Sequence, residues 1–219
     1  MTQPNVHSAA KSTTMKRDFS SETAMAKEEL RRIMRVRLRE IDAAQRAEKS
    51  LLLCELAAHA PSFAASRCVG FFAPLPSEPD IAPLIEEAWA QHKRVALPVM
   101  IRHGNKPQLN WHEVANWDEL VMTGPFGLRE PDPLRAPRVT AGELDCVFVP
   151  GLAFDRDGFR LGRGGGFYDC FLANVRAGLP KIGLMFECQR VPSVPRESHD
   201  HPLPEVITES GVTPFPPSS

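Results

Sequence analysis

Two neighbouring stretches decide the fold: Asp145-Cys146-Val147-Phe148-Val149-Pro150-Gly151 and Arg160-Leu161-Gly162-Arg163-Gly164-Gly165-Gly166-Phe167-Tyr168-Asp169. The first is a short apolar run closed by turn residues, which is typical of a buried strand. The second is rich in glycine and leads into a helix-like segment that starts at Phe167. Open α/β sheets bind their ligands where a strand end leads into a helix, so this pair of stretches predicts an α/β fold with a ligand site.

The glycine-rich segment, residues 160–169, predicts a phosphate-binding site. Glycine permits positive φ and lets the backbone approach a ligand closely, and a helix N-terminus attracts anions. Arg160, which we expect to be exposed, and Arg163 add charge-assisted donors, and Asp169 is a candidate ligand for the metal ion that accompanies a polyphosphate. The segment matches neither the P-loop nor the dinucleotide pattern, so a solvated loop with a helix cap stays open as an alternative.

The rest of the chain alternates between strand-like and helix-like segments. This alternation predicts a single α/β domain, a three-layer αβα arrangement with a mostly parallel central sheet. Asp42 followed by Gln45 predicts a capping box. The segment 123–137 is dense in proline and glycine and is expected to cross the surface. Helices are expected over residues 24–40, 43–59, 81–92 and 167–176, and strands over 67–73, 95–99, 109–114, 145–149, 181–186 and 206–208.

The two ends of the chain are polar or rich in proline. We therefore predict a disordered tail over residues 1–22, one domain over 23–211 and a loose tail over 212–219. The first segment lacks the apolar stretch of a secretory signal. At 219 residues the chain is long enough to bury a core of its own.

Composition excludes several classes of partner and site. The net charge of −1 provides no overall field for nucleic acid or an anionic membrane, and no apolar run approaches the roughly 20 residues of a membrane helix. The five cysteines are scattered without a Cys-x-x-Cys pair, so neither a disulfide framework nor a zinc site is predicted. We expect a cytoplasmic protein that is a monomer or a weak homo-oligomer and binds small molecules.

Three charged positions outside the glycine-rich segment are further candidates. Lys27 and Arg31 share one face of the first predicted helix, although a solvated basic stripe with the neighbouring arginines is the alternative. Glu78 lies in a loop that prolines stiffen, which suits a placed carboxylate, although such a residue can also simply face solvent.

Two more residues invite a functional interpretation. In His199-Asp200-His201 neighbouring side chains of an extended segment point to opposite sides, so we do not expect this motif to hold one ion together and favour Asp200 alone, as an oxygen ligand suited to magnesium. Tyr168 is the only tyrosine, either a core aromatic or a surface for a flat ligand.

Taken together, these segments resemble the 5-formyltetrahydrofolate cyclo-ligase family, also called methenyltetrahydrofolate synthetases. The resemblance runs in order from about Lys27 to Glu209, and its most specific part is the segment 149–169. Two positions depart from the family pattern: Gly165 stands where lysine is common, and Cys170 stands where arginine usually follows the aspartate. The matching segments are Lys27-x-x-x-Arg31, residues 71–78, 127–131, 149–155 and 160–169, Gln189 and His199-Asp200.

The resemblance implies an enzyme that converts 5-formyltetrahydrofolate to 5,10-methenyltetrahydrofolate with ATP and Mg²⁺, releasing ADP and phosphate. It also implies roles for residues, with Lys27, Arg160 and Tyr168 as the catalytic groups. A folate- or nucleotide-binding homologue without turnover and a kinase for another small substrate stay open as alternatives. By the same likeness ATP would contact Lys27, Arg31, Arg160, Leu161, Gly162, Arg163, Gly164, Gly165, Gly166, Phe167 and Tyr168; the folate would contact Ala73, Glu78, Arg163, Gly164, Gly165, Gly166 and Phe167, with Phe167 and Tyr168 on the pterin side; and magnesium would contact Asp169 and Asp200.

Overall fold

An eight-stranded sheet runs through the centre of the computed structural model, which describes residues 7–122, 129–197 and 200–216, with side chains from residue 21 onward. The strand order is β12-β11-β10-β7-β1-β2-β3-β6. Neighbours from β11 to β2 are parallel, and the outer strands β12, β3 and β6 are antiparallel to theirs. The strands are β1 Cys68–Gly70, β2 Arg94–His103, β3 Lys106–Val114, β6 Arg138–Val139, β7 Cys146–Val149, β10 Lys181–Leu184, β11 Glu205–Thr208 and β12 Gly211–Pro214.

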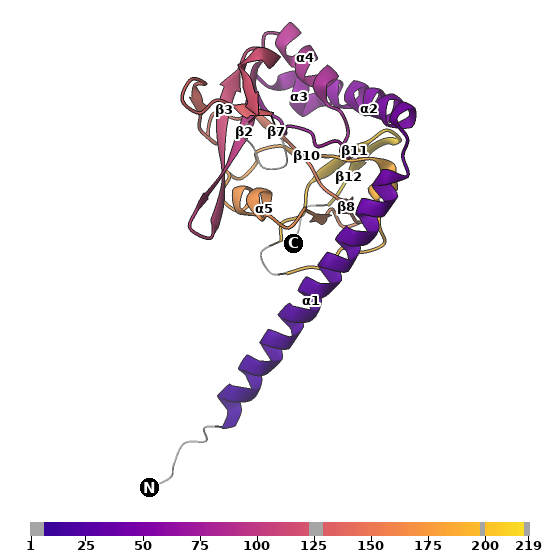
Figure 1. The fold of residues 1–219 in the computed structure, drawn as a ribbon, viewed down its shortest axis with the longest axis vertical. Coiled ribbons are helices and arrows are strands. Elements are labelled where there is room, and N and C mark those ends of the chain that lie inside the picture. The colour runs from indigo at the N-terminus through magenta and orange to yellow at the C-terminus, as the bar shows by residue number, and fades with distance from the viewer. Residues whose placement is uncertain (1–6, 123–128, 198–199, 217–219) are drawn as a thin grey trace.

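Helices cover both faces of this sheet (Figure 1). The alternation along β7 shows the two layers: Cys146 and Phe148 pack into the core on the side of α2–α4, and Val147 and Val149 into the core that includes Leu172 of α5. Burial on both faces explains why this strand is apolar throughout. The predicted three-layer αβα arrangement with a mostly parallel sheet is confirmed. The helices are α1 His7–Arg39, α2 Ala43–Ala58, α3 Pro61–Ala65, α4 Ala82–Ala90 and α5 Phe167–Leu172, with 3₁₀ turns η1 Trp117–Glu119 and η3 Glu187–Gln189.

The first helix is longer than predicted. α1 begins at His7 rather than at residue 24 and so includes most of the segment expected to be a disordered tail. No proline or glycine lies between its ends, so nothing interrupts the backbone hydrogen bonds. Its C-terminal half packs against the rest of the domain, since Met34 and Leu38 are fully buried in one core cluster with Leu161. The capping box of α2 is confirmed: Asp42 Oδ1 accepts from Gln45 N at 2.8 Å, and Gln45 Oε1 accepts from Asp42 N at 3.4 Å.

The C-terminal segment was wrongly predicted to be loose. Residues 211–214 form β12, which pairs antiparallel with β11, and Phe215 is only 7% exposed. Pro214 obscured this strand, because proline cannot donate a hydrogen bond to a neighbouring strand, which is least costly at a sheet edge such as β12. Residues 217–219 lie outside the described part of the chain.

Other boundaries shift where burial fades along an element. β2 and β3 form a long hairpin whose far end is exposed, so their outer residues lack the apolar pattern of the predicted strands. The segment 123–137 does not simply cross the surface: residues 123–128 lie outside the described ranges, while β5 (Arg129–Pro131) pairs with β4 (Leu120–Met122) and buries Glu130. A second two-stranded sheet joins β8 (Ala153–Phe154) to β9 (Arg160–Leu161).

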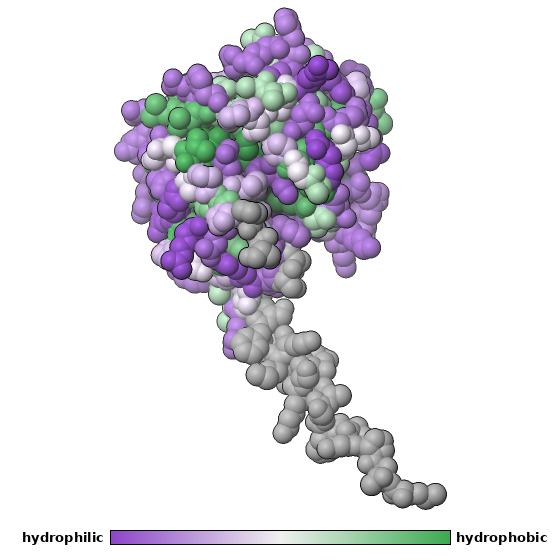
Figure 2. Space-filling view, turned by 180° about the vertical axis from the view of Figure 1, so that it is seen from behind, coloured by the Kyte–Doolittle hydropathy of each residue, from purple (hydrophilic) through white to green (hydrophobic). Residues whose placement is uncertain are grey.

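Hydrophilic residues make up most of the face seen in Figure 2, with an apolar area within the body. Over the residues that the structure describes, no helix combines the length and the apolar character needed to cross a bilayer.

Candidate functional site

A cavity of about 960 Å³ opens where the glycine-rich segment meets the loop after β1. Its walls come from six parts of the fold: the end of α1 with the start of α2, the loop 72–78, the strand β2, the strand β5, residues 150–151 after β7 and the segment 160–169. Predicted residues in the lining are Ala73, Glu78, Arg160, Gly162, Arg163, Gly165, Gly166, Phe167, Tyr168 and Asp169. Sequence positions far apart are therefore brought to one site.

The glycine loop, residues 162–166, links β9 to α5 and turns sharply. Gly164 has φ +98° and Gly166 has φ +73°, values that side chains rarely allow, so glycine is required at both positions. Two arginines hold this loop from outside. Arg31 Nε on α1 donates to Gly162 O, and Arg102 Nη2 on β2 donates to Gly165 O, each at 3.0 Å. The loop is thus positioned by tertiary contacts.

A buried ion pair ties the glycine loop to the loop after β1. Arg163 Nε donates to Glu78 Oε1 at 2.7 Å, and Arg163 Nη2 donates to Ser77 Oγ at 2.9 Å. Glu78 is 5% exposed, and its Oε2 also accepts from Leu75 N at 2.9 Å. Burial raises the pKa of Glu78, and Arg163 and the Leu75 amide oppose that rise only in part. The alternative of a solvent-facing glutamate is wrong.

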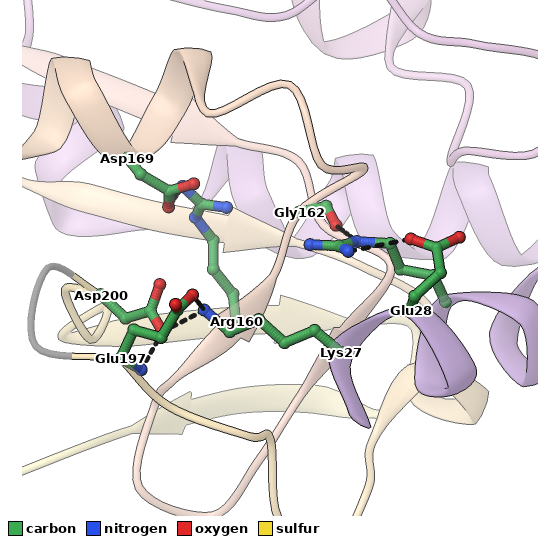
Figure 3. Close-up of polar contacts among 8 residues, drawn as sticks. Lys27, Glu28, Arg160, Gly162, Asp169, Glu197 and Asp200 are labelled. Atoms are coloured by element: carbon green, nitrogen blue, oxygen red, sulfur yellow. Dashed lines mark hydrogen bonds and ion pairs between the residues drawn. The ribbon is translucent and has the colours of Figure 1, made fainter. Parts of the chain in front are cut away.

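Arg160 is buried, not exposed as predicted. Arg160 is 6% exposed, because the β8–β9 hairpin packs against α1. Its Nη2 donates to Asp169 Oδ1 at 2.7 Å (Figure 3). The guanidinium carbon lies 5.9 Å from the centre of the Tyr168 ring. Arg160 Nε and Tyr168 Oη are buried without a hydrogen-bond partner among the described residues. Burial raises the pKa of Tyr168. Arg160 and Tyr168 of the cavity wall therefore each have a polar atom with unused hydrogen-bonding capacity.

Lys27 reaches from α1 to two carboxylates near the other end of the chain (Figure 3). Its Nζ lies 2.6 Å from Asp200 Oδ2 and 2.7 Å from Glu197 Oε2, and Lys27 is 7% exposed. Burial opposes its charge, but the hydrogen bonds with Asp200 and Glu197 outweigh it and raise the pKa of Lys27. Lys27 is thus a buried ion-pair residue, not part of a solvated stripe.

The two predicted magnesium ligands belong to separate ion pairs, Asp169 with Arg160 and Asp200 with Lys27. Among the residues that the structure describes, no three histidine, cysteine or acidic residues are grouped to hold a metal ion. His199 of the predicted motif lies outside these residues. The carboxylates thus form no ready-made metal cage.

Some predicted residues lie beside the cavity instead of lining it. Leu161 is 2% exposed and packs in the core against α1. Also absent from the cavity wall are Gly164 of the glycine loop and three predicted residues of other segments, Lys27, Arg31 and Asp200.

The two departures from the family pattern have different settings. A Cβ at position 165 would lie 2.9 Å from a carbon of the Phe167 ring, so a larger residue at this position would require the Phe167 ring to move. Cys170 is exposed on α5 and lies outside the cavity wall.

Five charged residues of the cavity wall were missed from the sequence. Arg35 follows Lys27 and Arg31 at helical spacing, so its position was readable, but the stripe was attributed to solvent. Nothing in the sequence distinguishes Arg46, whose Nη2 caps the end of α1 at Leu38 O and whose buried Nη1 has no partner within the described ranges. The missed residues are Arg35, Arg39, Arg46, Arg102 and Glu130.

Comparison with known proteins gives a consistent result. The model of the "5-formyltetrahydrofolate cyclo-ligase family" matches residues 23–209. The 5-formyltetrahydrofolate cyclo-ligase of Escherichia coli K12 is 38% identical over 155 residues, 69% of this chain and 83% of that protein. The mouse protein of the same name is 30% identical over 84% of this chain and 94% of its own. The NMR structure of the 5,10-methenyltetrahydrofolate synthetase of Aquifex aeolicus superposes with a TM-score of 0.75 at 30% identity, over 88% of this chain and 94% of that one.

Proposed function

The chain belongs to the 5-formyltetrahydrofolate cyclo-ligase family, and we propose that it converts 5-formyltetrahydrofolate to 5,10-methenyltetrahydrofolate at the expense of ATP. The observation that carries this proposal is the cavity beside the glycine loop. It is lined by arginines and apolar side chains, and its described wall contains no histidine, serine–histidine or cysteine–histidine pair. A reaction driven by phosphoryl transfer depends on positioning and charge and needs no protein nucleophile.

The reaction proceeds in two steps that account for every bond. The formyl oxygen attacks the γ-phosphorus of ATP, ADP leaves, and an iminium phosphate forms on N5. N10 then attacks the formyl carbon, the bond from this carbon to the phosphorylated oxygen breaks, phosphate departs and N10 loses its proton. A formamide oxygen is a poor leaving group until it is phosphorylated, which is why ring closure requires ATP.

The glycine loop and its flanks are the proposed ATP site. Arg160 Nε and Tyr168 Oη support this assignment, because both are buried at the cavity without partners among the described residues. Arg31 already contacts Gly162 O and is placed to approach phosphate oxygens without rebuilding the loop. Lys27 stands one helical turn before Arg31 and adds a second cation to the same flank.

Mg²⁺ fits this site through single carboxylates, because it keeps several waters and takes one or two protein oxygens beside the phosphates. Asp169 and Asp200 are the proposed ligands. Each now neutralises a cation, Arg160 and Lys27 respectively, so ATP binding would transfer these cations to phosphate and leave the carboxylates for the metal. The bound ion would offset the charge that develops on the phosphate oxygens.

The folate is proposed to lie between the glycine loop and the loop after β1. Ala73 and Glu78 form one side of this part of the cavity, and Phe167 provides an apolar ring on the other. Arg163 joins the two sides through its bonds to Glu78 and Ser77, so the position of the loop after β1 depends on that of the glycine loop.

The direct test is an assay of the purified protein with 5-formyltetrahydrofolate, ATP and Mg²⁺. Methenyltetrahydrofolate should appear by its near-ultraviolet absorbance together with one ADP per turnover. Arg160→Lys should raise the KM for ATP, while Arg156→Ala, an 86% exposed arginine away from the cavity, should leave it unchanged. Tight folate binding with no ADP release would instead indicate a non-catalytic homologue, and ADP release with an unrelated acceptor a kinase.

A cytoplasmic location and a monomer or weak homo-oligomer stay predictions. All five cysteines are free thiols in the structure, which suits a reducing compartment.

A further inference from the structure

Glu130 is a buried carboxyl group in the wall of the cavity. It lies on β5, is 3% exposed and shares that wall with Met100 and Phe167. Its Oε1 accepts one hydrogen bond, from Met100 N at 3.3 Å. Across the part of the chain that the structure describes, no cation lies within the 4.0 Å of an ion pair.

Comparison with Glu78 shows what Glu130 lacks. Glu78 is buried in the same wall, and Arg163 and the Leu75 amide both donate to it. Glu130 has one long bond from an amide, so burial raises the pKa of Glu130 with little to oppose it. A buried carboxylate is costly unless donors satisfy it. Donors that arrive with a ligand would remove this cost.

We propose that Glu130 binds the pterin ring of the folate by accepting hydrogen bonds from ring N3–H and the 2-amino group. This inference rests on the proposed function. An ionised carboxylate offers two acceptor oxygens side by side, which match two neighbouring N–H donors. The corresponding edge of adenine pairs its 6-amino donor with the N1 lone pair, which a carboxylate would repel. Glu130 thus selects the pterin over the nucleotide base.

The surroundings of Glu130 suit a flat ring. Pro98, Met100 and Phe167 add apolar surface to the same cavity, as in sites where a few polar groups orient a mainly apolar ligand. The guanidinium of Arg102 lies 4.9 Å from the centre of the Phe167 ring and holds one face of that ring in place. The pterin is therefore placed at the wall formed by β2 and β5, beside the glycine loop that Arg102 also contacts.

The test is folate binding without ATP by Glu130→Gln, with Glu205→Gln as the matched control. Glutamine keeps the size of the side chain but replaces one acceptor oxygen by an N–H donor that faces the donors of the ring. Glu205 is also a glutamate whose pKa burial raises, but it lies on β11 and outside the cavity wall. By calorimetry, the Kd for 5-formyltetrahydrofolate should rise about 10- to 100-fold in Glu130→Gln and stay unchanged in Glu205→Gln. The Kd for ATP with Mg²⁺ should change in neither.

A folate analogue with hydrogen in place of the 2-amino group completes the cycle. The wild-type protein should bind this analogue about 10-fold more weakly than the parent folate, and Glu130→Gln should lose that preference. If Glu130→Gln fails to fold, Glu130→Ala repeats the comparison. Equal folate affinity in variant and wild type, or a loss confined to ATP, overturns the assignment and leaves the proposed reaction intact. A wild-type protein that binds no folate overturns both.

Discussion

Replacing Arg163 by methionine should destabilise the protein, because Glu78 would lose its cation while staying buried. Breaking a fully buried ion pair costs about 3–5 kcal/mol, and a fully exposed one about 0–1 kcal/mol. The side chain of Glu78 is 5% exposed and that of Arg163 32%, so the expected loss is about 2–3 kcal/mol. For a chain of this size that corresponds to a Tm lower by about 4–12 °C.

Urea unfolding followed by circular dichroism measures this loss. Arg94→Met is the matched control, since Arg94 pairs with Glu113 at 2.8 Å but is 42% exposed, and it should cost less than about 1 kcal/mol. Adding Glu78→Gln to Arg163→Met should restore most of the stability, because no buried charge is left behind. A loss in Arg163→Met no larger than in Arg94→Met would show that Glu78 does not depend on Arg163 for its stability.

The same pair predicts a pH dependence with a definite sign. Burial already raises the pKa of Glu78, and loss of Arg163 would raise it further. At acid pH the Glu78 carboxyl is neutral and needs no cation, so the cost of Arg163→Met should shrink as pH falls and be largest when Glu78 is ionised. A cost that grows toward acid pH would contradict the buried carboxylate.

Three other substitutions test the fold and the loop by urea unfolding. Asp145→Asn should cost about 1–2 kcal/mol at neutral pH. The Cys68 amide, with that of Arg67, lowers the pKa of Asp145, so the stabilisation by Asp145 is present above about pH 4 and is lost as pH falls through the pKa of the folded state. A wild-type protein whose unfolding free energy falls no more steeply toward acid pH than that of the variant would contradict this. Phe215→Ala should cost about 3 kcal/mol if the C-terminal strand is packed as observed, and a change below about 1 kcal/mol would restore the loose tail. Gly166→Ala should cost about 1–2 kcal/mol, since φ is +73°, and raise the KM for ATP; an unchanged KM would argue against the loop as the phosphate site.

The layered fold was readable from the sequence because burial leaves periodic patterns. The continuous apolar run at β7 and the capping box at Asp42 predicted a strand and a helix start that the structure confirms. The hairpin β2–β3 was only partly read, because its outer residues are exposed and carry no apolar alternation. The edge strand β12 was missed because Pro214 lacks the backbone N–H of a strand donor and therefore argues against a strand in the sequence.

The candidate site was readable where a local motif carries it and unreadable where only the tertiary fold does. Glycine spacing identified the loop, but no local pattern shows that Arg102 on a distant hairpin holds Gly165. We expected Arg160 to be exposed because arginine side chains usually are, whereas its ion pair with Asp169 allows the side chain of Arg160 to be buried. Glu130 lies in the matching segment 127–131, but its burial could not be recognised, since one buried glutamate in a proline-rich stretch leaves no periodic signal.

In the proposed reaction the formyl oxygen itself is phosphorylated beside the glycine loop. A single-turnover reaction of 5-formyltetrahydrofolate labelled with ¹⁸O in the formyl group, with mass spectrometry of the phosphate released, follows this oxygen. The labelled atom should appear in inorganic phosphate, because the C–O bond breaks when N10 attacks the formyl carbon. Label found in water, with unlabelled phosphate, would contradict it.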